Sequence, residues 1–216
     1  MTKIYSKALE KELEVGRLIG KKASEEEGPV LIFTGGIHGN EPSGIFALKK
    51  VLDKIDSENI PFKGAFYAIS GNLWALERGE RFHKHDLNRL WSMDRMELLK
   101  SGKLKSEDED TSQQLEIYDL ISNILEKEKG PFYFIDLHTT SSETMPFLTV
   151  NDSLLNRKFT EQYPVPMILG IEEYLDGPLL SYINELGYIA FGFEGGQHDD
   201  LASIENHEAF VWLSMV

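Results

Sequence analysis

The sequence contains no cysteine among its 216 residues. This absence excludes disulfides, thiolate metal sites, iron–sulfur clusters and cysteine nucleophiles. Any metal ion bound by the chain must therefore be held by histidine, aspartate or glutamate side chains. We expect the chain to fold without disulfides or metal clusters, because 41% of the residues are apolar and a chain of this length can bury a substantial core. We expect residues 1–216 to form a single domain.

Positive charge and long apolar runs are also scarce. The chain carries 22 lysines and arginines against 36 acidic residues, a formal net charge of −14. Such a surface repels phosphate groups, which argues against nucleic acid or an anionic membrane as a partner. No apolar run approaches the roughly 20 residues needed to span a bilayer, and the first residues, MTKIYSKALEKELEV, lack the apolar segment of a signal peptide. We therefore expect a cytoplasmic location.

Two common catalytic motifs are missing as well. The sequence has no Gly-x-Ser-x-Gly elbow, which disfavours serine hydrolase chemistry. It also has no glycine-rich loop followed by the lysine that binds nucleotide phosphates. The candidate chemistry must therefore come from other residues.

Apolar runs and helical patterns alternate along the chain. Strand patterns cover residues 28–36, 62–72, 131–140, 146–150, 165–170 and 188–196. Helical spacing of apolar residues covers 42–55, 111–129, 178–187 and 203–216. The charge-dense residues 99–112 are expected to form an exposed loop. This alternation predicts an α/β fold with a mixed, largely parallel sheet flanked by helices.

Polar side chains follow three of the predicted strands. His38 and Glu41 lie in GGIHGNEPSG after the first strand, His138 ends FYFIDLH, and Glu194 ends IAFGFE. In open α/β sheets the ligand site lies at the carboxyl ends of the strands, so these side chains are expected to lie close together. Two histidines and a carboxylate are a recurrent ligand set for catalytic zinc. Asp136 stands two residues before His138, where its carboxylate is expected to orient a metal-binding side chain or its loop. Each residue alone also fits an ordinary structural role, since isolated His-x-x-Glu patterns and strand-end histidines are common in loops.

Four motifs together resemble one known family. GGIHGNEPSG, RFHKHDLNR, IDLHTT and FEGGQ occur in the order and approximate spacing of the succinylglutamate desuccinylase and aspartoacylase family, a branch of the zinc carboxypeptidase clan. The resemblance runs from about residue 15 to the C-terminal end of the chain. It implies a zinc carboxypeptidase-like catalytic domain.

The resemblance also implies a set of site residues. It makes His38, Glu41 and His138 the ligands of one zinc ion per chain, and Glu194 the general base and acid. Arg81 then polarises the scissile carbonyl, while Asn88 and Arg89 hold the substrate carboxylate. Guanidinium groups suit both tasks, because they stabilise developing negative charge and bind carboxylates in a bidentate manner. Without the resemblance, surface ion pairing would be the simpler reading of both arginines.

The chain departs from the family in two respects. Aspartoacylase-type members usually continue well past the catalytic glutamate into a β-rich domain, whereas here 22 residues follow Glu194. We therefore expect a minimal form without that domain, a truncated product, or a subunit whose site is covered by a partner, for which a second copy in a homo-oligomer is a candidate. Those members also carry an arginine shortly before the glutamate, where this chain has Asn184. This difference makes N-acetylaspartate a poor candidate substrate.

Three functional hypotheses follow. The leading one is a zinc-dependent hydrolase of the amide bond in a small anionic N-acyl amino acid. The first alternative is a zinc carboxypeptidase that acts on peptide C-termini, and the second is a non-catalytic binding protein that retains the metal pocket. Of the remaining histidines, His83 and His85 are expected to be exposed, His198 to line the cleft mouth, and His207 to lie on a helix surface.

Overall fold

The computed structural model describes residues 1–104 and 108–215. Its main sheet has seven strands in the order β3-β5-β4-β6-β9-β7-β8. Their bounds are β3 Leu18–Ala23, β4 Val30–Gly35, β5 Ala65–Ser70, β6 Phe132–Thr140, β7 Phe147–Val150, β8 Met167–Leu169 and β9 Ile189–Gln197. The central strands β5, β4, β6 and β9 run parallel, while β3 and β7 pair antiparallel with their neighbours β5 and β9. The predicted mixed, largely parallel α/β sheet is confirmed.

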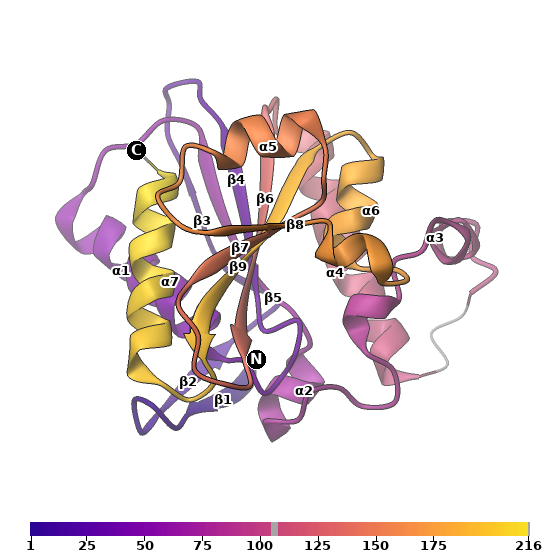
Figure 1. Ribbon diagram of the computed structural model, residues 1–216, viewed down its shortest axis with the longest axis horizontal. Helices are drawn as coiled ribbons and strands as arrows, with labels where there is room; N and C mark the ends of the chain where they lie inside the picture. The colour runs from indigo at the N-terminus through magenta and orange to yellow at the C-terminus, as the bar shows by residue number, and fades with distance from the viewer. Residues whose placement is uncertain (105–107, 216) are drawn as a thin grey trace.

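Helices cover both faces of this sheet. Figure 1 shows α1 (Ser43–Glu58) and α7 (Leu201–Ser214) on one side, and α4 (Glu109–Lys127) and α6 (Leu179–Glu185) on the other. Side chains alternate between the two faces, so Leu31 and Phe33 pack in the core with α1 and α7, whereas Val30 and Ile32 pack in the core with α4 and α6. Burial on both faces explains the continuous apolar sequence of β4.

The remaining elements surround this core. A hairpin of β1 (Thr2–Ser6) and β2 (Lys11–Val15) packs near α1 and α2, and shorter elements join the strands. These are α2 Leu73–Arg78, η1 Leu87–Arg89, α3 Met93–Lys100, α5 Leu154–Thr160 and η2 Ile171–Tyr174. No helix in the described ranges is long and apolar enough to cross a membrane.

One sequence prediction in this region was partly wrong. Residues 99–112 are not one exposed loop, because Leu99 ends up buried in α3, and Asp110 and Thr111 are buried in the first turn of α4. Residues 105–107 of that range lie outside the described residues. The helix α4 begins earlier than predicted because Asp108 caps it by accepting a hydrogen bond from the Thr111 amide.

The topology brings the ends of three strands together. Strand β6 lies between β4 and β9, and all three run in the same direction. The loop after β4 carries His38 and Glu41, while His138 and Glu194 are direct neighbours in the register of β6 and β9. The residues that the strand-end pattern singled out therefore meet at one edge of the sheet.

Candidate metal centre and active site

A tight turn after β4 positions the first two site residues. Gly36 adopts a left-handed φ of +70°, and a Cβ atom on Gly39 would lie 2.1 Å from the carbonyl carbon of Ala75. Only glycine fits such an approach. The Glu41 amide then donates to the His38 carbonyl at 3.1 Å, and Pro42 begins helix α1. The glycines and proline of GGIHGNEPSG thus fold the chain back so that His38 and Glu41 face each other.

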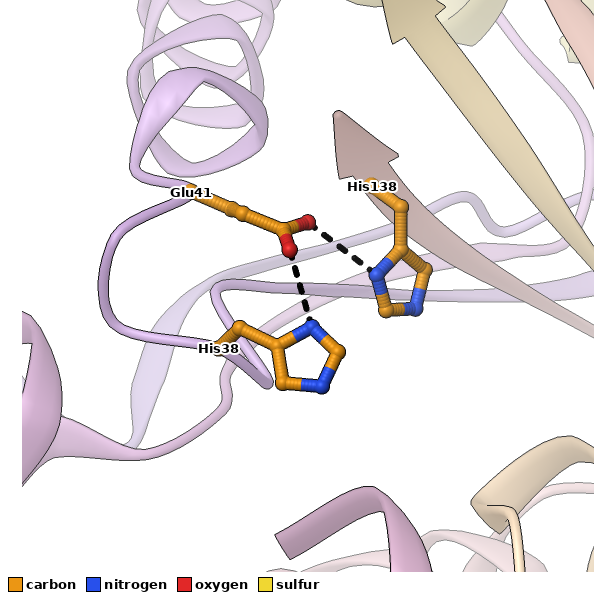
Figure 2. A group of neighbouring side chains, drawn as sticks. All are labelled: His38, Glu41 and His138. Atoms are coloured by element: carbon orange, nitrogen blue, oxygen red, sulfur yellow. Dashed lines mark hydrogen bonds and ion pairs between the residues drawn. The ribbon is translucent and has the colours of Figure 1, made fainter. Parts of the chain in front are cut away.

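His38, Glu41 and His138 form a compact buried group (Figure 2). Nδ1 of His38 lies 2.9 Å from Oε1 of Glu41, and Nδ1 of His138 lies 3.2 Å from Oε2. The backbone amide of Thr139 donates to the same Oε2 at 2.9 Å. One candidate ligand atom from each of the three residues lies within 4.8 Å of the others. Both imidazoles therefore turn the same ring nitrogen toward the carboxylate.

Each histidine of the group is held by a second carboxylate on its other ring nitrogen. Nε2 of His38 lies 3.1 Å from Oδ1 of Asp86, and Nε2 of His138 lies 2.8 Å from Oδ2 of Asp136. Thr34 in turn donates its hydroxyl to Oδ1 of Asp136 at 2.6 Å. Such carboxylates fix the tautomer and orientation of a metal-binding imidazole and raise its basicity. The inward-facing nitrogens are thereby left as the ligand atoms.

The electrostatics of the group favour a cation. Burial acts to raise the pKa of Glu41, but hydrogen bonds from His138 and His38 outweigh it and hold that pKa well below its usual range. Burial likewise acts to lower the pKa of His138, but the charge of Asp136 and its hydrogen bond raise it well above the ordinary value. The Glu41 shift reflects the two histidines that face its carboxylate, whereas the His138 shift reflects the negative charge of Asp136 and Glu41. A positive ion at the centre of the group is stabilised by that same charge.

The donor set fits a metal ion. Two imidazole nitrogens and a carboxylate are the ligands of a catalytic zinc site that keeps a position open. Among the described residues, this is the one group of three or more candidate ligands that converges in this way. The residues present could therefore hold a metal ion.

Glu194 lies beside this group on the adjacent strand. It pairs in register with His138, and its Oε2 atom is buried without a hydrogen-bond partner among the described residues. Burial raises the pKa of Glu194, and the negative charges of Glu41 and Asp136 add to that rise against the opposing histidines. A carboxylate in this setting has a strong tendency to take up a proton.

Arg81 reaches the group from the segment that follows α2. Its Nη2 atom lies 2.9 Å from Nε2 of His38 and 3.2 Å from Oδ2 of Asp86, and its Nη1 atom lies 3.5 Å from Oε1 of Glu41. The side chain is 43% exposed. The guanidinium therefore lies at the solvent-facing border of the group, where a ligand could reach it.

Asn88 and Arg89 lie close to the group but do not contact it in the described residues. Oδ1 of Asn88 accepts a hydrogen bond from the Leu179 amide at 2.9 Å, so this side chain caps the start of α6 and directs its NH₂ the other way. Arg89 donates from Nη1 to the Asn88 carbonyl at 2.6 Å. Both residues follow Asp86, which accepts from the Asn88 amide at 2.9 Å and so ties their segment to His38.

The exposure of the other histidines was predicted correctly for two of them and wrongly for one. His83 and His85 are exposed, as expected. The prediction that His207 lies on a helix surface was wrong, because it is fully buried under the site. Its Nε2 donates to the His138 carbonyl at 2.9 Å, and its Nδ1 pairs with Ser43 Oγ at 3.1 Å. Burial lowers the pKa of His207 to about 4, so it is neutral at pH 7.

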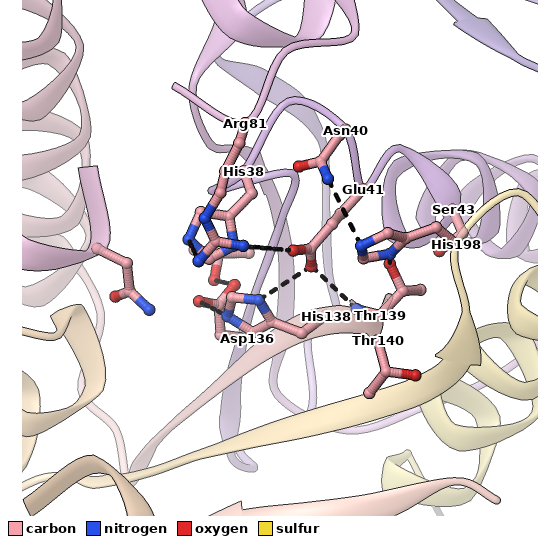
Figure 3. A network of polar contacts seen from close by, with 12 residues as sticks. His38, Asn40, Glu41, Ser43, Arg81, Asp136, His138, Thr139, Thr140 and His198 are labelled. Atoms are coloured by element: carbon pink, nitrogen blue, oxygen red, sulfur yellow. Dashed lines mark hydrogen bonds and ion pairs between the residues drawn. The ribbon is translucent and has the colours of Figure 1, made fainter. Parts of the chain in front are cut away.

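Two further residues were missed or left open by the sequence. Asp86 was not singled out from the sequence, although it lies within RFHKHDLNR. The basic residues on both sides of this aspartate were the available signal for a role at the site. Nδ1 of His198 contacts Oγ1 of Thr139 at 2.6 Å, and its Nε2 lies 3.5 Å from Nδ2 of Asn40. Figure 3 shows His198 on the side of Glu41 away from Arg81. The polar network thus extends beyond the three candidate ligands.

Comparison with known proteins places this chain in a family. The profile of the succinylglutamate desuccinylase/aspartoacylase catalytic domain matches residues 27–203. A succinylglutamate desuccinylase of Pseudomonas putida (strain GB-1) is 36% identical over 69 residues, which cover 32% of this chain and 21% of the relative. The matched segment thus spans about a fifth of that relative's length.

Solved structures show the same fold. A succinylglutamate desuccinylase from Chromobacterium violaceum superposes with a TM-score of 0.68 at 16% identity, covering 88% of this chain and 61% of the other. One from Vibrio cholerae gives 0.70 at 19% identity, covering 88% and 57%. Because the profile matches most of the sequence, the chain belongs to the succinylglutamate desuccinylase/aspartoacylase family.

Proposed function

We propose that this protein is a zinc-dependent hydrolase that cleaves the amide bond of an N-acyl amino acid. The observation that carries the proposal is the buried group of His38, Glu41 and His138 with Glu194 paired beside it on the next strand. The succinylglutamate desuccinylases among the relatives support an acyl-amino acid substrate. The family's zinc carboxypeptidase-like ligand set supports zinc over other metals.

His38, Glu41 and His138 would hold the zinc ion, with Asp86 and Asp136 fixing the two imidazoles. When bound there, zinc supplies Lewis-acid polarisation of the amide carbonyl and of water. Glu194 takes the proton that water loses as it attacks, since its raised pKa gives it the basicity for this step. It then delivers that proton to the leaving amine, because an ammonium-forming nitrogen is a better leaving group.

Arg81, Asn88 and Arg89 would bind and orient the substrate. The Arg81 guanidinium borders Glu41 and His38, so it can meet the carbonyl oxygen as negative charge develops there. The Asn88 amide is fixed by Leu179 with its NH₂ end free to donate to an anion. Together with the Arg89 guanidinium it makes a directional clamp for the substrate carboxylate.

The test is turnover of a panel of N-acyl amino acids and short peptides by zinc-loaded protein. We expect hydrolysis of at least one N-acyl amino acid, and a loss of about 10²- to 10⁴-fold in kcat in Glu194→Gln. Glu143→Gln makes the same change on an exposed loop residue and should keep full activity. Hydrolysis of peptides alone would favour the carboxypeptidase alternative, and equal activity in both variants would refute the role of Glu194.

A further inference from the structure

A cavity of about 630 Å³ lies next to the substrate-binding segment. Its wall is built by the stretch after Arg89, by η2 and by the start of α6. Five acidic side chains line it and, among the described residues, no basic one does: Asp94, Glu172, Glu173, Asp176 and Glu185. The indole of Trp91 and the ring of Tyr182 form an aromatic part of the same wall. The cavity therefore combines acidic and aromatic surface.

Three buried polar atoms in this wall have no hydrogen-bond partner among the described residues. They are Nε1 of Trp91, Oδ1 of Asn151 and Oε2 of Glu172. The Asn151 amide is fixed, because its Nδ2 donates to Ser181 Oγ at 3.0 Å and to Asn184 Oδ1 at 2.9 Å. Glu172 lines the cavity although it is only 8% exposed. Burying a carboxyl group without a partner is costly, so Glu172 is the side chain of this wall that gains most from a cationic partner.

The cavity is joined to the candidate active site through the backbone. The Trp91 amide donates to the Gly177 carbonyl at 3.0 Å, and the Leu179 amide donates to Asn88 Oδ1 at 2.9 Å. A Cβ atom on Gly177 would lie 2.6 Å from the carbonyl oxygen of Arg89, so these two segments are in close contact. The wall of the cavity is therefore a direct continuation of the Asn88 and Arg89 clamp.

Glu172 also interacts electrostatically with charged residues of the candidate site. Burial raises the pKa of Glu172 to about 7. The charges of Asp136 and Glu194 add to the rise, while those of His138 and Arg89 oppose it. Arg89 and Glu172 therefore lie within electrostatic range of each other.

The lining selects the charge of the ligand. Acidic groups and aromatic faces attract a cation, whereas an anion would be repelled. A metal ion would need several ligand atoms converging on one point, and in the described part of the chain only the His38, Glu41 and His138 group does so. An organic cation, whose hydrogen-bond donors and apolar stem are spread over a larger volume, matches the cavity better.

We propose that this cavity binds the protonated side-chain amine of the substrate's amino-acid half, with Glu172 as the residue that recognises it. The inference rests on the proposed function and narrows its substrate class to N-acyl diamino acids. In this arrangement Arg89 binds the α-carboxylate and Glu172 pairs with the ammonium group.

Binding of the free amino acid tests the cavity without requiring turnover. Calorimetry at about pH 8, where Glu172 is mostly ionised, would compare L-2,4-diaminobutyrate, L-ornithine and L-lysine with L-norvaline, which is ornithine without its amine. We expect the best diamino acid to bind at least about tenfold more tightly than norvaline. Glu172→Gln should abolish that preference and leave norvaline binding unchanged. Glu143→Gln, the same loss of charge at an exposed residue outside the cavity lining, should keep it.

Several outcomes would overturn the inference. Equal binding of ornithine and norvaline, tighter binding of L-glutamate, or equal effects of Glu172→Gln and Glu143→Gln would each do so. Unfolding curves and zinc content of both variants show whether they fold like the parent.

Turnover of N-acetyl-L-ornithine and N-acetyl-L-norvaline separates this inference from the proposed function. Hydrolysis of both at equal kcat/KM would refute the cavity inference alone. No hydrolysis, together with Glu172-dependent binding of a diamino acid, would refute the hydrolase and leave the amine site supported.

Discussion

Glu172 allows a prediction about stability that needs neither metal nor substrate. Burial raises its pKa from 4.5 to about 7 in the folded protein, and in the unfolded chain the carboxyl returns to about its ordinary value. The folded state therefore holds the proton more tightly than the unfolded state. This contribution to stability is fully present below about pH 4.5 and is lost as the pH rises through about 7.

Glu172→Gln removes this dependence, because glutamine resembles the protonated carboxyl and does not ionise. A pKa change from 4.5 to about 7 corresponds to about 3 kcal/mol. At about pH 8 the variant should be more stable than the parent by that order, which for a domain of this size raises Tm by roughly 6 °C or more. Toward about pH 4 the difference should shrink almost to zero.

The assay is thermal unfolding by circular dichroism of parent and variant across this pH range. Glu143→Gln serves as the control for the loss of one acidic charge, since Glu143 is exposed and lies outside this cavity. A Glu172→Gln variant whose Tm tracks that of the parent at every pH would refute the reasoning. A stabilisation that is equally large at about pH 5 would refute it too, because ionisation could not then be the cause.

Three further predictions concern the candidate site. Asp136→Asn should weaken zinc binding by about 10- to 100-fold in competition with a chromogenic chelator, because it removes the carboxylate that holds His138 at 2.8 Å; unchanged affinity would contradict this. Arg81→Ala should chiefly lower kcat, whereas Arg89→Ala should chiefly raise KM, and steady-state kinetics showing the reverse would exchange their roles. Gly39→Ala should lower Tm by several degrees, because its Cβ has no room beside α2 and overpacking costs about 1–3 kcal/mol; a wild-type Tm would show that the turn can relax.

The strands of the core and the positions of their ends could be predicted from the sequence. A strand covered on both faces must be apolar throughout, so β4, β5 and β6 stand out as unbroken runs bounded by glycine or polar residues. Parallel neighbours then place their carboxyl ends at one edge. The meeting of His38, Glu41 and His138 follows from this rule and the tight turn after β4.

The edge of the fold was harder to predict for a physical reason. Strands β1, β2 and β3 read TKIYS, KELEV and LIGKKA, because each exposes one face to solvent and carries charged residues there. Short polar strands of this kind are defined by their pairing partners rather than by their own apolar content. No pattern in the first 23 residues therefore distinguished them from loop.

Two buried polar residues show a second limit. His207 stands among polar neighbours in SIENHEAF, yet its ring bonds the carbonyl of His138, which is 69 positions away. Glu172 lies in the acidic stretch IEEYLDG, where exposure is the expected state. Burial of either side chain depends on which distant segment packs over it, and a single sequence carries no signal for that contact.

The local charge of the site has a different consequence from the net charge of the whole chain. The net charge of −14 disfavours only large anionic partners such as nucleic acid. Within the described site, however, the carboxylates of Glu41, Asp86, Asp136 and Glu194 surround two histidines and the guanidinium of Arg81. Such an excess of buried negative charge is unfavourable unless a cation offsets it. A bound dication removes most of that excess, and a proton taken up by Glu194 removes more. Beyond the effect of burial, the same concentration of carboxylates that favours a cation also raises the pKa of Glu194.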